Sequence, residues 1–153
     1  MNHALIAQRT VTINAPASKV WDALTNPSLI KQYLFGTEAV SDWKAGSPLI
    51  FKGVWEGKEY LDKGVILRSE PEKLFEYTYL SSFSGLADVP ENYSIITFEI
   101  QPDNGRTSLG IRQSNILTEQ AKTHSEENWG GVLKTLKELV EAQEPVVDPA
   151  RAD

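Results

Sequence analysis

The most informative absence in this 153-residue sequence is that of cysteine. Without a thiol, the chain cannot form a disulfide, a thiolate zinc site or a cysteine nucleophile. Histidine is nearly absent as well, because only His3 and His124 occur and they lie far apart in the sequence. We therefore predict no metal site, no cofactor and no serine–histidine catalytic relay.

Long apolar runs and a surplus of basic residues are also missing. No stretch approaches the roughly 20 apolar residues of a membrane-spanning helix, and the N-terminus lacks the basic and then apolar segments of a secretory signal. The formal net charge is −6, which argues against nucleic acid as a partner. We expect a cytoplasmic monomer without a membrane span, since no feature such as a heptad seam indicates a second copy.

Two short helices are predicted directly after a first strand. Residues 5–13 alternate apolar and polar side chains, which is typical of a half-buried strand. Pro16 suits the first turn of a helix, where its missing N–H is not needed. Asn26 and Pro27 then provide an N-cap and a first position for a second helix, which we expect to end at Phe35-Gly36.

Apolar and polar side chains alternate again, as in a strand, after residues 37–47, which we predict to be irregular. Short turns are expected at Glu56-Gly57, at Pro71 and at Asp103-Asn104-Gly105, the last being the strongest hairpin signal in the chain. Strands joined by such short turns pair with their neighbours in the antiparallel direction. The predicted strands span residues 49–55, 58–69, 75–79, 94–100 and 109–113.

The period changes to that of a helix from about Thr118, and the predicted helix of about 24 residues would span roughly 36 Å. The tail 143–153 has too little apolar content to pack and is expected to be disordered. We predict a single domain at 5–142 with an α+β fold. Its curved antiparallel sheet of about six strands wraps around the long C-terminal helix, and the two short helices follow the first strand.

Three stretches carry a resemblance to a known family. They read Ile13-Asn-Ala-Pro-Ala-Ser-Lys-Val-Trp-Asp-Ala-Leu, Trp55-Glu-Gly-Lys-Glu-Tyr-Leu-Asp-Lys-Gly and Trp129-Gly-Gly-Val-Leu-Lys-Thr-Leu-Lys. With the order of the elements, they resemble the START-like helix-grip superfamily (SRPBCC), and within it the proteins named for the activator of the heat shock protein 90 ATPase. The resemblance covers about residues 5–142.

The resemblance implies a cavity between the concave face of the sheet and the last helix. The superfamily includes lipid carriers, hormone receptors, polyketide cyclases and co-chaperone domains, so the fold by itself does not fix a function. The eukaryotic co-chaperone also has a separate N-terminal domain. Only four residues precede the first predicted strand, and we expect this chain to lack that domain.

Aromatic side chains fall on the faces that we assign to the interior. They could fill a closed core, since each ring buries about 150–250 Å². They could instead line a pocket, where phenolic hydroxyls orient the polar group of a ligand. A buried phenol without a partner costs roughly 1–3 kcal/mol, which favours a polar partner for the tyrosines. The candidate ligand-binding residues are Tyr33, Phe51, Tyr77, Tyr79, Phe83, Phe98, Leu109, Gln113, Trp129 and Leu133.

Three further segments allow two interpretations each. The loop 81–91 is either a cap on the core or a lid over a cavity mouth. The pair Gly130-Gly131 costs a helix about 2 kcal/mol relative to alanine, which indicates close packing beside Trp129 or a hinge. The acidic group Asp42, Glu56, Glu59 and Asp62 is expected at the solvated surface, although a carboxylate pair at a cavity rim can do acid–base work.

Three functions follow from these patterns. The first is non-catalytic binding of a small apolar or amphipathic molecule, such as a lipid or an aromatic metabolite. The second is an interaction with a chaperone of the heat shock protein 90 type, as the resemblance implies. The third is a cyclase or hydrolase acting on an apolar substrate, which requires an inward acid or base. No catalytic residue is singled out by the sequence, and a non-enzymatic role is favoured.

Overall fold

The computed structural model describes residues 5–34, 36–81 and 85–143, which form three α-helices, seven strands and one short 3₁₀ helix. Their bounds, in chain order, are β1 Leu5–Ile13, α1 Ala17–Thr25, α2 Pro27–Tyr33, β2 Glu38–Ser41, β3 Pro48–Trp55, β4 Lys58–Glu70, β5 Leu74–Tyr79, the 3₁₀ helix Pro90–Asn92, β6 Ser94–Asp103, β7 Arg106–Ile116 and α3 Glu119–Gln143. Apart from Gln143, the predicted disordered tail lies outside the described residues.

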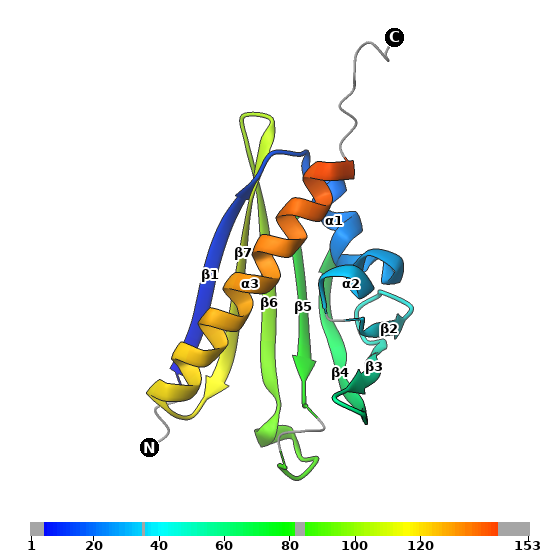
Figure 1. Ribbon diagram of the computed structural model, residues 1–153, viewed down its shortest axis with the longest axis vertical. Helices are drawn as coiled ribbons and strands as arrows, with labels where there is room; N and C mark the ends of the chain where they lie inside the picture. Colours follow the sequence, from blue (N-terminus) through cyan, green and yellow to red (C-terminus); the bar gives the residue numbers. More distant parts are fainter. Residues whose placement is uncertain (1–4, 35, 82–84, 144–153) are drawn as a thin grey trace.

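All seven strands belong to one antiparallel sheet in the order β1-β7-β6-β5-β4-β3-β2. Helix α3 lies diagonally across one face of this sheet. Helices α1 and α2 lie beside the C-terminal half of α3 (Figure 1). The α+β helix-grip fold is therefore confirmed. None of the described helices has both the length and the apolar character of a membrane span.

The sheet has one strand more than the six expected. The additional strand, β2, lies within the stretch that we expected to be irregular, and it pairs with β3 from Glu38↔Lys52 to Ser41↔Leu49. It is an edge strand of four residues in which only Ala39 is fully buried. A strand of four residues with one buried side chain is too short to show the apolar–polar alternation that distinguishes a strand from a loop.

The two short helices begin as their prolines indicate. Pro16 is the N-cap of α1, and Pro27 is the first residue of α2. The Asn26 side chain accepts a hydrogen bond from the Ser28 N–H at 3.0 Å and so caps α2. The Tyr33 hydroxyl then donates to the Ala23 carbonyl at 2.8 Å, which fixes α2 against α1.

Helix α3 holds the exposed edge of β1 through two glutamates. Glu126 accepts a hydrogen bond from the Gln8 N–H at 3.1 Å, and Glu141 accepts one from the Asn14 N–H at 2.7 Å. The Gln8 N–H lowers the pKa of the Glu126 carboxyl, with a further contribution from Lys122. These bonds satisfy backbone donors that an edge strand would otherwise leave unpaired.

The two glycines in α3 have different surroundings. A Cβ placed on Gly130 would lie 2.5 Å from the Arg9 guanidinium, whereas a Cβ on Gly131 would meet nothing within 4 Å. The end of the Arg9 side chain therefore packs over Gly130, which agrees with the interpretation of close packing. Nothing in the structure explains Gly131.

We expect Gly131→Ala to raise the free energy of unfolding by about 0.5–1 kcal/mol, because alanine is the better helix former and its methyl group meets no neighbour. Gly130→Ala is the matched control, and its gain should be smaller because the Arg9 side chain must move. Urea unfolding of both variants measures the difference. A loss of stability in Gly131→Ala would indicate that the glycine has a role in helix bending.

Candidate functional site

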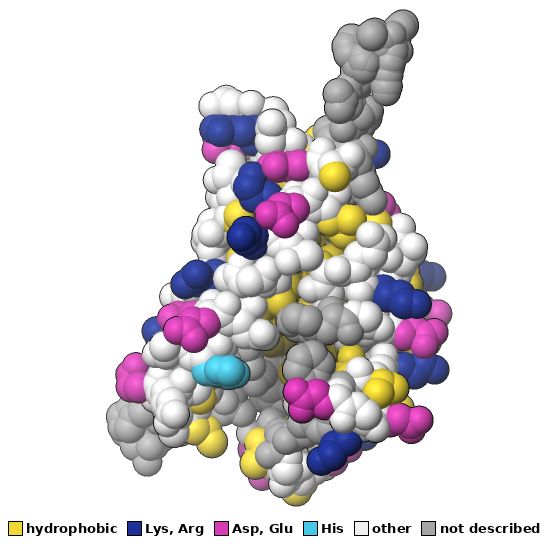
Figure 2. Space-filling model, viewed as in Figure 1, with side chains coloured by type: hydrophobic (Ala, Val, Ile, Leu, Met, Phe, Trp, Pro, Cys, Tyr) yellow, Lys and Arg dark blue, Asp and Glu magenta, His cyan; other side chains and the backbone are white. Residues whose placement is uncertain are grey.

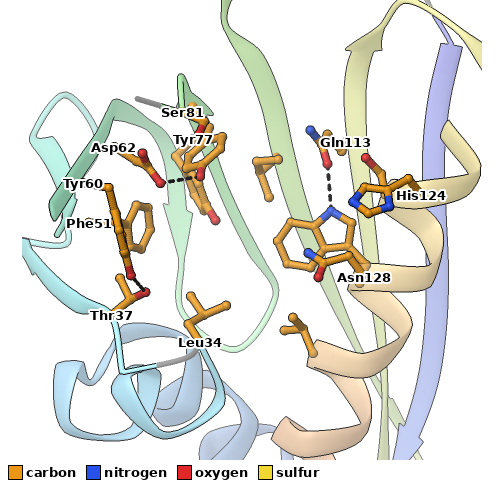
Figure 3. Close-up of a pocket in the computed structure, with 15 residues that line it drawn as sticks. Leu34, Thr37, Phe51, Tyr60, Asp62, Tyr77, Ser81, Gln113, His124 and Asn128 are labelled. Atoms are coloured by element: carbon orange, nitrogen blue, oxygen red, sulfur yellow. Dashed lines mark hydrogen bonds between the residues drawn. The ribbon is translucent and has the colours of Figure 1, made fainter. Parts of the chain in front are cut away.

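A cavity of about 420 Å³ lies between the concave face of the sheet and the N-terminal half of α3. The molecule is hollowed on this face, and apolar side chains are visible in the depression (Figure 2). Two walls enclose the space, as the close-up shows (Figure 3). The strand wall and the segment after α2 supply Leu34, Thr37, Phe51, Tyr60, Asp62, Tyr77, Tyr79, Ser81 and Ile96; β7 and α3 supply Gln113, His124, Ser125, Asn128, Trp129 and Val132.

The strand wall carries a buried carboxylate. Asp62 is only 7% exposed, and the Tyr79 hydroxyl donates a hydrogen bond to it at 2.7 Å. Burial raises the pKa of Tyr79 well above its ordinary value, and the negative charge of Asp62 raises it further. Tyr79 therefore keeps its proton at neutral pH and remains a donor to Asp62.

A pair of hydroxyls also lies on this wall. The hydroxyls of Thr37 and Tyr60 share a hydrogen bond of 2.5 Å. The Tyr60 ring lies against Gly53, the residue opposite it on β3, where an added Cβ would lie 2.6 Å from the Tyr60 oxygen. Glycine at this position therefore provides the space in which the ring turns toward Thr37.

The helix wall is organised by an indole. Trp129 Nε1–H donates to Gln113 Oε1 at 2.8 Å, which joins α3 to β7 (Figure 3). The Trp129 ring also packs edge-on against Phe98, with ring centroids 5.9 Å apart. His124 and Asn128 lie one turn apart on α3, line the same cavity and are more exposed than Trp129.

Tyr77 is the cavity residue whose polar group is least satisfied. It is 5% exposed, and its hydroxyl makes no hydrogen bond to any residue within the described ranges. Burial raises its pKa well above the ordinary value, so the phenol is neutral and carries a proton at physiological pH. A buried hydroxyl without a partner is unfavourable by roughly 1–3 kcal/mol. A ligand or water in the cavity would remove that cost.

The structure brings five of the ten predicted ligand-binding residues to this cavity: Phe51, Tyr77, Tyr79, Gln113 and Trp129. Tyr33, Phe98, Leu109 and Leu133 are instead buried in the core outside its lining. Two of these, Tyr33 and Phe98, border a void of only about 20 Å³. Phe83 lies outside the described residues.

Sequence reasoning missed the polar part of the lining. Asp62 was expected at the solvated surface, yet it is buried. The signal was present, because the alternation along β4 places Asp62 on the same face as Tyr60 and the buried Ile66. His124 and Asn128 lie two turns and one turn before Val132, and the surrounding charged residues concealed this inward face of α3.

The loop after β5 is held in place along its second half. Asp88 pairs with Lys63 at 2.5 Å and accepts a hydrogen bond from the Tyr93 hydroxyl at 2.6 Å. Asn115 donates to the carbonyls of Glu91 and Tyr93 at 2.9 and 3.0 Å. These contacts anchor residues 88–93 to β4 and β7. Whether the loop acts as a cap or a lid stays a prediction.

The described residues contain no group of three metal-ligating side chains. The charged or titratable side chains in the cavity lining are those of Asp62 and His124, together with the tyrosines. The cavity therefore offers hydrogen-bond donors and acceptors around an apolar interior, an arrangement that suits the binding of a small molecule.

We expect Tyr77→Phe to leave the free energy of unfolding unchanged or to raise it by up to about 1 kcal/mol, since it removes a buried hydroxyl that has no partner. Tyr79→Phe should lower it by about 1–3 kcal/mol, because Asp62 loses a donor. Thermal and urea unfolding of the two variants in the absence of ligand measure the difference. Equal destabilisation by both would contradict the assignment of Tyr77 as unsatisfied.

Comparisons with known proteins agree with this architecture. The family model described as activator of Hsp90 ATPase homolog 1-like protein matches residues 14–141. The solution structure of ChR145 from Cytophaga hutchinsonii is 44% identical, over 91% of this chain and 95% of that chain, with a TM-score of 0.80. No match was found among curated proteins.

Two more distant solved structures show the same fold. MLL2253 from Mesorhizobium loti is 23% identical, over 93% of this chain and 99% of that chain, with a TM-score of 0.73. The structure described as the Aha1 dimer from Colwellia psychrerythraea is 19% identical, over 92% and 98% of the two chains, with a TM-score of 0.71.

Proposed function

The chain belongs to the family of activator of Hsp90 ATPase homolog 1-like proteins, and on that premise we propose that it binds a small apolar or amphipathic molecule in the cavity between the sheet and α3. The observation that carries the proposal is the volume of about 420 Å³. It lies within the range of roughly 300–1,000 Å³ that small-molecule sites occupy. A lipid with a short chain or an aromatic metabolite fits this description.

The distribution of side chains supports a ligand more than an unfilled defect in the core. Phe51, Ile96, Trp129 and Val132 provide apolar surface, while polar groups are placed at a few points around it. An empty cavity costs van der Waals contacts along its whole lining. Occupation by an apolar molecule restores those contacts, and the Tyr77 hydroxyl can orient its polar group.

A survey of hydrophobic small molecules by NMR tests this proposal. We expect ligands to shift the amide signals of Tyr77 and Tyr79 and the indole signal of Trp129, because all three residues line the cavity. Signals from the opposite face, such as that of Glu59, serve as the internal control. If no member of a broad set of apolar and amphipathic compounds shifts the cavity signals, the proposal is wrong.

A chaperone-related role is the second candidate, and the description of the family favours it. The outer face of β3 and β4 exposes Val54, Leu61 and Val65, which would provide apolar contact area for a protein. The test is the ATPase rate of a chaperone of the heat shock protein 90 type with and without this chain. An unchanged rate at saturating concentration removes this candidate and leaves ligand binding unaffected.

A cyclase or hydrolase is the third candidate, and buried Asp62 is the observation that favours it. Mass spectrometry of each ligand after incubation with the protein tests for conversion, with Asp62→Asn as the comparison. Recovery of every ligand unchanged would exclude this role for the compounds tested. We also propose that the chain is a monomer, although the Colwellia protein is described as a dimer; light scattering distinguishes the two states.

A further inference from the structure

We infer that the cavity selects neutral ligands that carry a hydrogen-bond acceptor, such as an amide, ketone or ester, and rejects carboxylates and other anions. The inference deepens the proposed binding function and rests on it. Three features of the described lining lead to it: the sign of the buried charge, the one phenol without a partner, and the apolar surface around them.

The charge of the lining is unfavourable to an anion. Asp62 is buried and held by the Tyr79 hydroxyl, and none of the described residues that line the cavity is lysine or arginine. His124 lies at the more exposed side, on the opposite wall. An anionic ligand would lose its hydration close to a carboxylate and gain no cation in return. A neutral ligand avoids this cost.

The hydrogen-bonding groups indicate what polar atom the ligand carries. Tyr79 already donates to Asp62, and the Trp129 indole already donates to Gln113. The Tyr77 hydroxyl has no such bond within the described ranges, and the residue is buried from bulk solvent. An acceptor oxygen on the ligand would take this proton, so the cavity is matched to a carbonyl or a similar group.

The apolar part of the lining determines the shape and polarity of the rest of the ligand. Phe51 packs against the rings of Tyr77 and Tyr79, with centroids 5.8 and 6.1 Å away, and so places apolar surface next to the free hydroxyl. Trp129 and Val132 face it from α3. A planar or branched apolar body with one neutral polar group therefore complements both walls.

The experiment compares two molecules of nearly the same shape, naphthalene-2-carboxamide and naphthalene-2-carboxylate, by calorimetry at neutral pH. We expect the amide to bind at least about tenfold more tightly, which corresponds to about 1.4 kcal/mol. The Trp129 indole signal verifies that binding takes place in the cavity. Tyr77→Phe should weaken the binding of the amide by roughly 3- to 10-fold, which is the effect of one net hydrogen bond.

Removing the buried charge tests the cause of the selectivity. Asp62→Asn keeps an oxygen that can accept from Tyr79, and it should reduce the preference for the amide several-fold. Glu59→Gln is the matched control, because it removes one negative charge from an exposed position on the same strand and should leave the preference unchanged. Urea unfolding establishes that each variant is folded.

The two proposals fail in different ways. If the carboxylate binds in the cavity as tightly as the amide, the inferred selectivity is overturned while ligand binding stands. A preference that Asp62→Asn and Glu59→Gln reduce equally overturns the assignment to Asp62. If neither compound binds at millimolar concentration while other ligands of the NMR survey do, the inferred selectivity is overturned; if no ligand of the survey binds either, the binding function is overturned with it.

Discussion

Replacing Gly64 with alanine is expected to lower the free energy of unfolding by at least about 3 kcal/mol. A Cβ at this position would lie 1.6 Å from the carbonyl oxygen and 2.5 Å from the carbonyl carbon of Thr78. Both atoms belong to the backbone of β5, so no side chain can rotate away to make room. The two strands would have to move apart, because no side-chain rotation can relieve this clash.

The contacts beside Gly64 show what separation would break. The Val65 N–H donates to Thr78 Oγ1 at 2.9 Å, and Lys63 and Leu80 exchange two backbone hydrogen bonds of 3.2 and 2.9 Å. The pairing of β4 with β5 continues at Ile66↔Tyr77, and its register shifts between Ile66 and Arg68. The close approach therefore lies where β4 turns away from β5 and carries Tyr60 and Asp62 to the cavity wall.

A matched control comes from another glycine in the same sheet. A Cβ on Gly110 in β7 would meet its nearest neighbour, Thr10 Oγ1, at 3.7 Å, which is ordinary contact. Gly110→Ala should therefore change the free energy of unfolding by less than about 1 kcal/mol. Urea unfolding of both variants provides the comparison. A Gly64→Ala protein as stable as Gly110→Ala would contradict the close approach of the strands.

Much of the fold could be predicted because local signals coincide with element boundaries. Pro16 and Pro27 mark the starts of α1 and α2, and Asp103-Asn104-Gly105 joins β6 to β7 as a hairpin signal should. The positive φ angles of Asn104 and Gly105, 53° and 86°, are those that favour these residue types in tight turns. β2 could not be found in this way, since its pairing with β3 is a tertiary contact without a local pattern.

The site could be predicted only in part. The periodicity of apolar residues shows which face of an element points inward, but it does not show whether that face packs against other side chains or borders a cavity. Phe51 and Tyr77 were assigned inward and line the cavity, while Phe98 and Leu109 share the same periodicity and lie in the closed core. The difference depends on which side chains of other elements pack against each position. No pattern within a single strand encodes those neighbours.

The burial of Asp62 was missed because two sequence signals conflict at this position. Its charge favoured the surface, and its register on β4 favoured the interior. In the structure, the register decides, because Tyr79 supplies the hydrogen bond that a buried carboxylate requires. The partner lies 17 positions away in the sequence, so the pairing could be recognised only once β4 and β5 were placed together.

The second large effect is expected for Phe75→Ala, which should lower the free energy of unfolding by about 3–5 kcal/mol. Phe75 is 2% exposed, and its ring contacts those of Trp21, Trp43 and Tyr77 at centroid distances of 6.0, 6.1 and 5.3 Å. This part of the interior, near α1, is packed solidly, since the void that borders it measures only about 20 Å³. Truncation would therefore remove contacts on every side of the ring.

Phe51→Ala makes the same chemical change beside the hollow part of the interior. Phe51 is also buried, at 7% exposure, yet one side of its ring faces the cavity of about 420 Å³ and has fewer neighbours to lose. Its truncation should therefore cost at least about 1 kcal/mol less than that of Phe75, measured by urea unfolding without ligand. A ligand that fills the cavity should increase the cost at Phe51 and leave that at Phe75 unchanged. Equal costs in the absence of ligand would mean that the interior beside Phe51 is as solid as that around Phe75, and the proposed binding site would lose its basis.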